Sequence, residues 1–250
     1  MGTWYSCRFV DYAVKSIVLP LPPVKIQVKI VNDLSKKLAE VDKLVEIQQA
    51  QIEKLKEYKQ LEICECVQNS LLKEAKIIKL KYICSSFNSN ITAGELLQNN
   101  LLTPVYGASG LMGYSATLGQ DEEYLGIIKD GAGVGRIKIY PKNSLLLGTM
   151  AYIFPNNGVN LSWLKYVIMS LKLSESLDKT TIPHIYFKDY GNKLVFYVDD
   201  STQKDIVSYL DDKCSNIDKL IEIKQAKIEK LQEYKKSLIY EYVTGKKEVG

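Results

Sequence analysis

The chain has 250 residues, of which 46% are hydrophobic and 25% charged, and its formal net charge at pH 7 is +4. These fractions exclude a disordered or fibrous chain, and the length allows one or two domains with a sizeable hydrophobic core. The sequence contains no run of about 18 apolar residues, which excludes a membrane-spanning helix. The mild positive charge permits a nucleic-acid partner without requiring one.

The cellular compartment is indicated by the N-terminus and by the cysteines. The first residues lack the order of basic, apolar and small side chains that defines a secretory signal peptide. The five cysteines are an odd number without the spacing of a disulfide framework, which is typical of reduced thiols. We therefore expect a cytoplasmic protein.

A sequence repeat organises the chain. Residues 27–67 match residues 203–243 without a gap, with identity at about 22 of 41 positions. Neither stretch contains Gly or Pro, and both are rich in Glu, Lys, Gln, Leu and Ile, which suit helices. The repeat predicts two long helices, over residues 24–70 and 200–245, each about 60 Å long.

Apolar residues in both helices recur at the a and d positions of a heptad, so each helix carries one apolar stripe. Gln48 and Lys224 interrupt the two stripes at matching positions. A single helix cannot bury its own stripe, so the helices must pack on each other, within one chain or across a dimer. Such a pair could be a spacer or only a dimerisation coiled coil. The stripe residues are Leu38, Val41, Val45, Ile52 and Leu55 in the first helix, and Ile217, Ile221, Ile228 and Leu231 in the second.

The segment between the helices, residues 71–199, holds most of the Gly and Tyr residues, and its apolar runs are short and bounded by turns. It reads as one globular α/β domain. The fold class is therefore α+β, with the domain flanked by two long helices that form a coiled-coil spacer. Strands are predicted at Tyr124–Lys129, Arg136–Tyr140, Leu145–Met150 and Ala151–Phe154, and a helix at Leu161–Leu171 that is capped by Asn160 or Ser162.

Two glycine-rich stretches, residues 106–114 and 129–136, invite comparison with nucleotide-binding loops. A P-loop needs Gly-Lys-Ser/Thr, which is absent, and a dinucleotide fingerprint must open a helix. Residues 137–140 instead alternate like a strand. The second stretch therefore favours a tight hairpin that brings the backbone close to another group.

No constellation of catalytic residues is recognisable in the sequence. His184 is the single histidine, so a histidine-based triad or metal site would rest on that residue alone. Cys64 and Cys66 form a C-x-C pair, but the repeat aligns them with Tyr240 and Tyr242, which indicates packing positions. We expect neither a metal site nor an enzyme.

Five segments carry patterns that point to one family: Leu19–Pro23, Pro104–Gly110, Lys129–Gly133, Ile182–Ile185 and Tyr240–Lys246. Together with the two helices, they resemble the specificity (S) subunit of type I restriction–modification systems. The resemblance implies that the globular domain is a target recognition domain, which reads DNA sequence, and that the chain is not catalytic.

The chain departs from the family in one respect. A full S subunit resembles two recognition domains that alternate with two helical regions, whereas this chain has one domain at residues 71–199. Phe9, Asp11, Tyr12 and Lys15 match Phe187, Asp189, Tyr190 and Lys193, so residues 1–23 resemble the remnant of a preceding recognition domain or linker; residues 246–250 form a tail. The resemblance implies a half-length subunit that pairs with a second copy.

The resemblance also implies partners. A homodimer would hold two recognition domains over the halves of a bipartite, palindromic site on double-stranded DNA, with half-sites about 34 Å or a multiple apart. Methyltransferase (M) subunits and motor-nuclease (R) subunits would complete the complex. S-adenosylmethionine, ATP and magnesium would belong to those partners, and no cofactor to this chain. The alternative keeps the fold but makes the chain a dimerising coiled-coil adaptor whose globular domain binds protein.

Candidate DNA contacts are residues that can meet phosphates or base edges. Arg136 is the first choice for a base contact, although it could also be a solvated charge at a strand end. Tyr106 and Tyr114 could equally pack in the core, and His184 could make a structural hydrogen bond. The candidates are Lys129, Arg136 and Lys138 beside the glycine turn, Tyr106, Ser109 and Tyr114 in the other glycine-rich stretch, and Thr180, Thr181, His184 and Lys188 around Ile-Pro-His.

Overall fold

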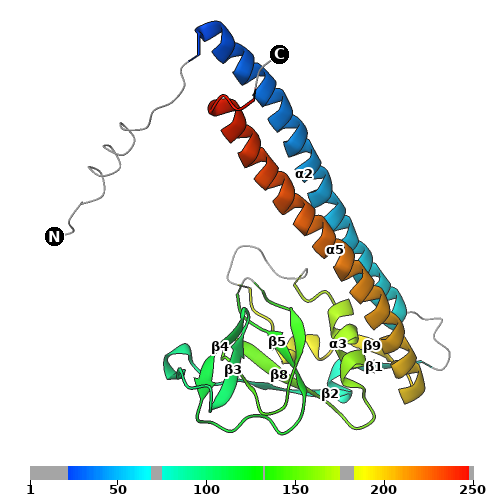
Figure 1. The fold of residues 1–250 in the computed structure, drawn as a ribbon. Coiled ribbons are helices and arrows are strands. Elements are labelled where there is room, and N and C mark those ends of the chain that lie inside the picture. The colour runs from blue at the N-terminus through cyan, green and yellow to red at the C-terminus, as the bar shows by residue number, and fades with distance from the viewer. Residues whose placement is uncertain (1–21, 69–74, 132, 175–182, 248–250) are drawn as a thin grey trace. The chain divides into compact units, whose positions relative to one another are not determined.

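The computed structural model describes residues 22–68, 75–131, 133–174 and 183–247 of the chain. Two long helices dominate these residues: α2 spans Val24–Val67 and α5 spans Asp200–Val243, with 44 residues each (Figure 1). The two long helices that the repeat predicts are thus confirmed. Of the described residues, those in 22–55 and 218–247 form one compact unit, which we call the helix unit, and those in 56–217 form the other, the globular unit.

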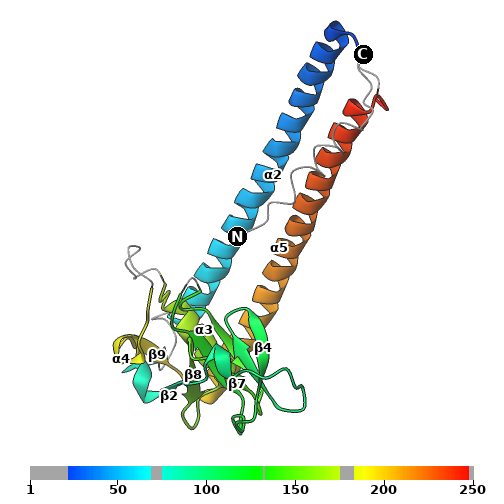
Figure 2. The same cartoon turned by 90° about the vertical axis from the view of Figure 1, so that its left-hand side faces the viewer.

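In the helix unit, the two helices run antiparallel, side by side (Figures 1 and 2). Lys235 Nζ lies 2.6 Å from Asp42 Oδ1, and Lys224 Nζ donates to Gln51 Oε1 at 2.7 Å, so residue numbers fall along one helix as they rise along the other. Val41 of α2 is buried in a small apolar cluster with residues of α5. The helices therefore pack on each other within one chain here. The buried members of the cluster are Val41, Leu238 and Tyr242.

The globular unit is a mixed α/β domain, as the sequence predicts. Besides the parts of α2 and α5 that belong to it, its described helices are α3, with ten residues, and α4, with four. Short 3-10 turns occur at Leu80–Tyr82 and Ala93–Glu95. The elements in chain order are β1 (Lys76–Lys79), β2 (Cys84–Asn88), β3 (Thr103–Gly107), β4 (Gly110–Ser115), β5 (Tyr124–Ile128), β6 (Ile137–Tyr140), β7 (Leu145–Leu146), β8 (Met150–Pro155), α3 (Leu161–Ser170), α4 (Phe187–Tyr190) and β9 (Leu194–Tyr197).

The strands form three small sheets in the described ranges. The largest has the order β2-β8-β5-β6 with antiparallel pairs, the second has the order β4-β3-β7, and β1 pairs with β9 alone. Strand β5 is buried along its whole length, as expected of an inner strand, whereas β6 lies at an edge. Residues of β6 are therefore reachable from the side of the sheet.

Two clusters of side chains fill the two faces of the largest sheet, because successive residues of a strand point to opposite faces. Leu125 and Ile127 of β5 pack in the main core with α3, which lies against the sheet (Figure 1). Tyr124 and Ile128 pack on the other face, in a cluster that also contains Tyr140 and Tyr152.

The main core also takes in the parts of the long helices that belong to the globular unit. Ile63 and Val67 of α2 and Leu210 of α5 are at most 2% exposed and share the core with Trp163 and Val167 of α3. Burial of such side chains contributes about 1.5–3 kcal/mol each. Both helices are thus anchored to the domain by apolar packing.

Most predicted elements of the domain are confirmed, and one is corrected. The strands predicted at Tyr124–Lys129 and Arg136–Tyr140 are β5 and β6, and α3 is capped by Asn160, whose side chain accepts from Trp163 N at 3.0 Å. The strand predicted over Leu145–Met150 is wrong, since a turn divides it into β7 and the start of β8. The turn forms because Met150 N donates to Leu147 O at 2.9 Å, and it sends the two strands into different sheets.

Candidate nucleic-acid interface

The glycine-rich stretch of residues 129–136 joins β5 to β6 as a hairpin loop, as predicted. Gly135 N donates to Ile128 O at 2.8 Å, and Ile128 N donates to Arg136 O at 3.0 Å, which closes the loop. Gly131 and Gly135 have φ angles of 92° and 83°, in the region that side chains rarely adopt. These two glycines are required by backbone conformation, which explains part of the pattern.

The loop around Ile-Pro-His, which the sequence predicts as a second candidate, lies against this hairpin loop. Gly131 N donates to Pro183 O at 3.2 Å, and Ile185 N donates to Lys129 O at 3.0 Å. Asp130 and His184 form an isolated antiparallel bridge between these two bonds. Two candidate loops about fifty residues apart in sequence are therefore one surface.

A side-chain contact joins the same two loops. His184 Nδ1 lies 2.7 Å from Asp130 Oδ1, and Lys129 Nζ lies 3.9 Å from Asp130 Oδ2. The alternative noted for His184, a structural hydrogen bond, is present. The imidazole is still 46% exposed, so part of the ring remains available to a ligand.

Tyr186 belongs to this surface, although it is not among the predicted contacts. Its ring stacks on His184 with centroids 6.5 Å apart and an interplanar angle of 16°, and Lys188 Nζ lies 5.2 Å from its centroid. The side chain is 52% exposed. Its place between two candidates in the sequence, as an aromatic residue flanked by basic ones, is the signal that identifies it.

Arg136 and Lys138 form a second group. Both are exposed. Arg136 immediately precedes the edge strand β6 and Lys138 lies in it, and because they are two residues apart in extended chain, they share a face. Together with Ala108 of the β3–β4 turn, they line a small cavity of about 20 Å³. The turn that carries Ser109 therefore lies near these two cations.

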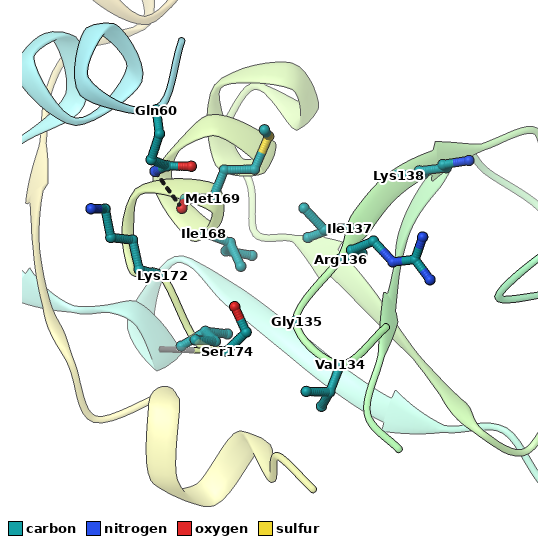
Figure 3. A pocket seen from close by; sticks show the side chains of 11 residues that line it. Gln60, Val134, Gly135, Arg136, Ile137, Lys138, Ile168, Met169, Lys172 and Ser174 are labelled. Atoms are coloured by element: carbon teal, nitrogen blue, oxygen red, sulfur yellow. Dashed lines mark hydrogen bonds between the residues drawn. The ribbon is translucent and has the colours of Figure 1, made fainter. Parts of the chain in front are cut away.

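The two cations also border a larger groove of about 310 Å³ (Figure 3). Gln60 and Lys172 lie on one side of the groove, and Arg136 and Lys138 on the other. Val134, Ile137 and Leu173 are among its apolar lining residues. Arg136 just before β6, Lys138 within it and Lys172, two residues after the end of α3, thus surround an apolar floor.

The remaining predicted contacts are distributed unevenly. Ser109 is exposed at the turn, where its hydroxyl lies 3.4 Å from Met112 Sδ. The ring of Tyr106 packs 5.3 Å from that of Tyr140, and Tyr114 is half-buried, so packing occupies both tyrosines. Thr180 and Thr181 lie outside the described residues.

A cluster of tyrosines supports the hairpins from below. Tyr124 Oη lies 2.8 Å from Ser144 Oγ, and Tyr152 Oη accepts from Leu146 N at 2.8 Å. Burial raises the pKa of Tyr124 and of Tyr140 above the ordinary value, so both phenols stay neutral. The cluster is an uncharged, hydrogen-bonded layer on the face of the largest sheet opposite the main core.

Of the predicted stripe residues, Val41 and Leu231 pack in the apolar cluster of the helix unit. Gln48, which interrupts the first stripe, is buried. Lys224, which interrupts the second, donates a hydrogen bond to Gln51 across the helix pair. Val41, Ile52, Ile217 and Ile228 are buried, and Leu38, Val45, Leu55, Ile221 and Leu231 are half-buried.

The two groups have the chemistry of anion-binding sites. Lys129, Arg136, Lys138 and Lys188 supply positive charge and donors, while Tyr186 offers an exposed ring. Within the described ranges, no group of three or more His, Cys, Asp or Glu side chains is placed to hold a metal ion, and no helix is long and apolar enough to cross a membrane. Phosphates and base edges are the ligands that such a surface suits.

Comparison with known proteins finds likeness in structure alone. No protein-family model and no curated protein matches the sequence. A chain from a structure of the complex assembly and conformational transition of the type I restriction–modification system matches with a TM-score of 0.74 at 17% identity, over 94% of this chain and 63% of that chain.

Two further solved structures are similar. The HsdS subunit from Thermoanaerobacter tengcongensis matches with a TM-score of 0.56 at 17% identity, over 94% of this chain and 62% of that subunit. The type I restriction–modification S subunit from M. genitalium matches with a TM-score of 0.51 at 16% identity, over 86% of this chain and 60% of that subunit. This chain thus spans less than two thirds of the length of the chains that it matches.

Proposed function

We propose that this chain, which has the fold of type I restriction–modification S subunits, recognises DNA sequence and positions methyltransferase subunits on it. The single observation that carries the proposal is that fold, which extends over nearly the whole chain and includes both long helices. The cationic surface of Lys129, Arg136, Lys138 and Lys188 supports the same function, because phosphate contacts dominate the affinity of proteins for DNA. In this proposal the globular unit reads one half of a bipartite site.

A second recognition domain is needed for the other half, and the repeat indicates where it docks. Four residues attach the long helices to the recognition domain in the globular unit. The matching positions of the repeat, which lie in the helix unit, hold residues of the same type. We call the first set the covered face and the second set the free face. The pairs, covered residue first, are Gln203 and Gln27, Val207 and Val31, Ile63 and Ile239, and Val67 and Val243.

The two faces differ in exposure. Ile63 and Val67 are 1% and 2% exposed in the core of the domain, whereas Ile239 and Val243 are 39% and 48% exposed. Val31 is 59% exposed. Contiguous exposed apolar side chains mark interaction surfaces, and these have the residue types that bind a recognition domain elsewhere in the same chain. We infer that the free face takes a second domain of the same fold.

A second copy of the chain is the simplest source of that domain. The complex is then a homodimer on an interrupted palindrome, because the symmetry of the site mirrors that of the protein. A different S-type chain would give an asymmetric site instead. In either form the chemistry belongs to partners: M subunits with S-adenosylmethionine and, for cleavage, R subunits with ATP and magnesium.

The test is a map of DNA methylation. The full chain is combined with its cognate methyltransferase subunits, and adenine methylation is read across a genome. An interrupted palindrome supports the homodimer, and an asymmetric bipartite motif supports pairing with a different chain. Two results would contradict the proposal and favour the adaptor. One is methylation that follows no motif, and the other is a chain that binds another protein but not DNA.

A further inference from the structure

Gly133 differs from the other glycines of the β5–β6 loop. Gly131 and Gly135 are fixed by positive φ angles, but the φ angle of Gly133 lies in the ordinary range, where any residue could stand. What a side chain at Gly133 would lack is space. A Cβ atom there would lie 2.7 Å from Arg136 Nε and 2.8 Å from Arg136 Cζ, and closer still to Nη2.

The guanidinium of Arg136 thus lies directly on the backbone of Gly133. Arg136 Nε donates to Gly133 O at 3.4 Å, and Arg136 N donates to the same oxygen at 3.1 Å. Both bonds come from one residue to one carbonyl, so they hold the start of the side chain to the loop. Nη2 lies nearest to Gly133, and among the described residues neither Nη atom has a hydrogen-bond partner.

Arg136 has its charge available. The side chain is exposed, and among the described residues no carboxylate forms an ion pair with it; Asp130, in the same loop, is engaged by His184 and Lys129. Of the two arginines in the sequence, Arg8 and Arg136, this is the one in the described ranges. A planar guanidinium with free donors suits bidentate contact with guanine or phosphate.

We propose that Gly133 is a positioning residue, which leaves room for the Arg136 guanidinium and holds it in one orientation for contact with DNA. The proposal rests on the proposed function, because it takes DNA as the ligand. Long side chains lose rotamer freedom on binding, and a side chain held in place beforehand loses less. Gly133 therefore adds to affinity and selectivity without touching the DNA.

The test is a double-mutant cycle in the complex with methyltransferase subunits. The probe is a duplex that carries the motif found by methylation mapping, and a scrambled duplex measures non-specific binding. Gly133→Ala should weaken binding to the motif by about 2- to 12-fold in the wild-type background, the range that corresponds to ordering one long side chain. In the Arg136→Ala background, the same change should have no further effect, because the group that it displaces is absent.

Two glycine controls separate this role from a structural one. Gly94→Ala should change nothing, since no atom lies within 4 Å of the added Cβ and the φ angle is ordinary. Gly131→Ala introduces strain at a φ angle of 92° and should weaken binding in both backgrounds. An equal loss from Gly133→Ala in both backgrounds, or no loss in either, would overturn the proposal. If the wild type has no motif at all, it is the proposed function that fails.

Discussion

Gln27 and Gln203 stand at the same position of the repeat and make the same hydrogen bond, but only one of them is covered. Gln203 Nε2 donates to Val198 O at 2.9 Å, and Gln27 Nε2 donates to Pro22 O at 2.7 Å, in each case five residues back along the chain. Gln203 is fully buried, and its Oε1 accepts from Asn160 N at 2.7 Å, at the N-cap of α3.

This pair predicts unequal effects of one substitution. Gln203→Ala leaves Asn160 N and Val198 O without partners in a buried site and should lower the free energy of unfolding by about 1–3 kcal/mol. Gln27→Ala should lower it by less than about 0.5 kcal/mol, because Gln27 is half-exposed in the isolated chain. Urea unfolding followed by circular dichroism measures both. Equal losses would mean that the two positions are in similar environments.

Val67 and Val243 occupy matching positions of the repeat, and the same substitution at each should have different effects. At Val67 it should disrupt the fold, and at Val243 it should disrupt only assembly. Val67→Lys places a charge in the core of the globular unit and should unfold it or lower its melting temperature strongly. Val243→Lys should leave the melting temperature unchanged and reduce association with a second recognition domain, as measured by light scattering. Leu44→Lys is the control, since Leu44 is 45% exposed in the helix unit but outside the free face. Unchanged association of the Val243→Lys variant would rule out the free face as the docking site.

Asp33 predicts a dependence of stability on pH. A hydrogen bond from Tyr242, and next one from Lys37, hold the pKa of the Asp33 carboxyl below its ordinary value of 3.8. The unfolded state therefore binds a proton more readily, so this contribution to stability is present above pH 3.8 and is lost as pH falls through the lowered pKa. Asp33→Asn should remove that part of the acid sensitivity. A urea midpoint that falls no more between pH 7 and pH 3 in the wild type than in the Asp33→Asn variant would contradict this interpretation.

Phosphate contacts predict a change in salt dependence. If Lys138 and Lys188 meet phosphates, each change to Ala should weaken binding to all duplexes alike and reduce the slope of log K against log salt by about 0.9. Lys43→Ala on α2, in the helix unit, should leave the slope unchanged. Filter binding at several salt concentrations gives the slopes. A loss of selectivity at one base pair, without a change in slope, would instead assign the lysine to base readout.

The long helices and the hairpin could be predicted because their signals are local or repeated. A gap-free repeat without Gly or Pro predicts α2 and α5, and Asn160 before an apolar run predicts the start of α3. The break after Leu146 could not be predicted, because the strand signal continues through the turn. That turn depends on Gly148 N, which donates to Ile91 O at 2.7 Å, a residue far back in the chain.

The candidate interface was predictable in its residues more than in its arrangement. The sequence indicates Lys129 and His184 as members of separate loops, and spacing cannot bring them together. Their contact depends on Asp130, whose role is visible only once the loops meet. Tyr186 was missed because a single tyrosine in a sequence is usually a packing residue. Its stacking on His184 and the position of Lys188 Nζ over its ring are visible only in the structure.

We expect the contact between Asp130 and His184 to hold the two loops together. His184→Ala removes the bond of 2.7 Å and should raise hydrogen exchange at the amides of Gly131 and Ile185, which donate to the opposite loop. Because a largely exposed side-chain contact of this kind is worth at most about 1 kcal/mol, the melting temperature should hardly change. DNA selectivity should fall, since Lys129 and the β5–β6 loop lose their fixed position.

Asp130→Asn is the matched variant for this contact. The amide keeps a hydrogen-bonding atom at the same place but loses the charge, so it should protect the two amides better than His184→Ala does. Tyr186→Phe should leave exchange unchanged, because the ring stack is retained and no described hydrogen bond uses its hydroxyl. Mass spectrometry of deuterium uptake compares all three. Uptake that stays at the wild-type level in His184→Ala would show that the main-chain bonds alone hold the loops together, and the fall in selectivity would then not be expected.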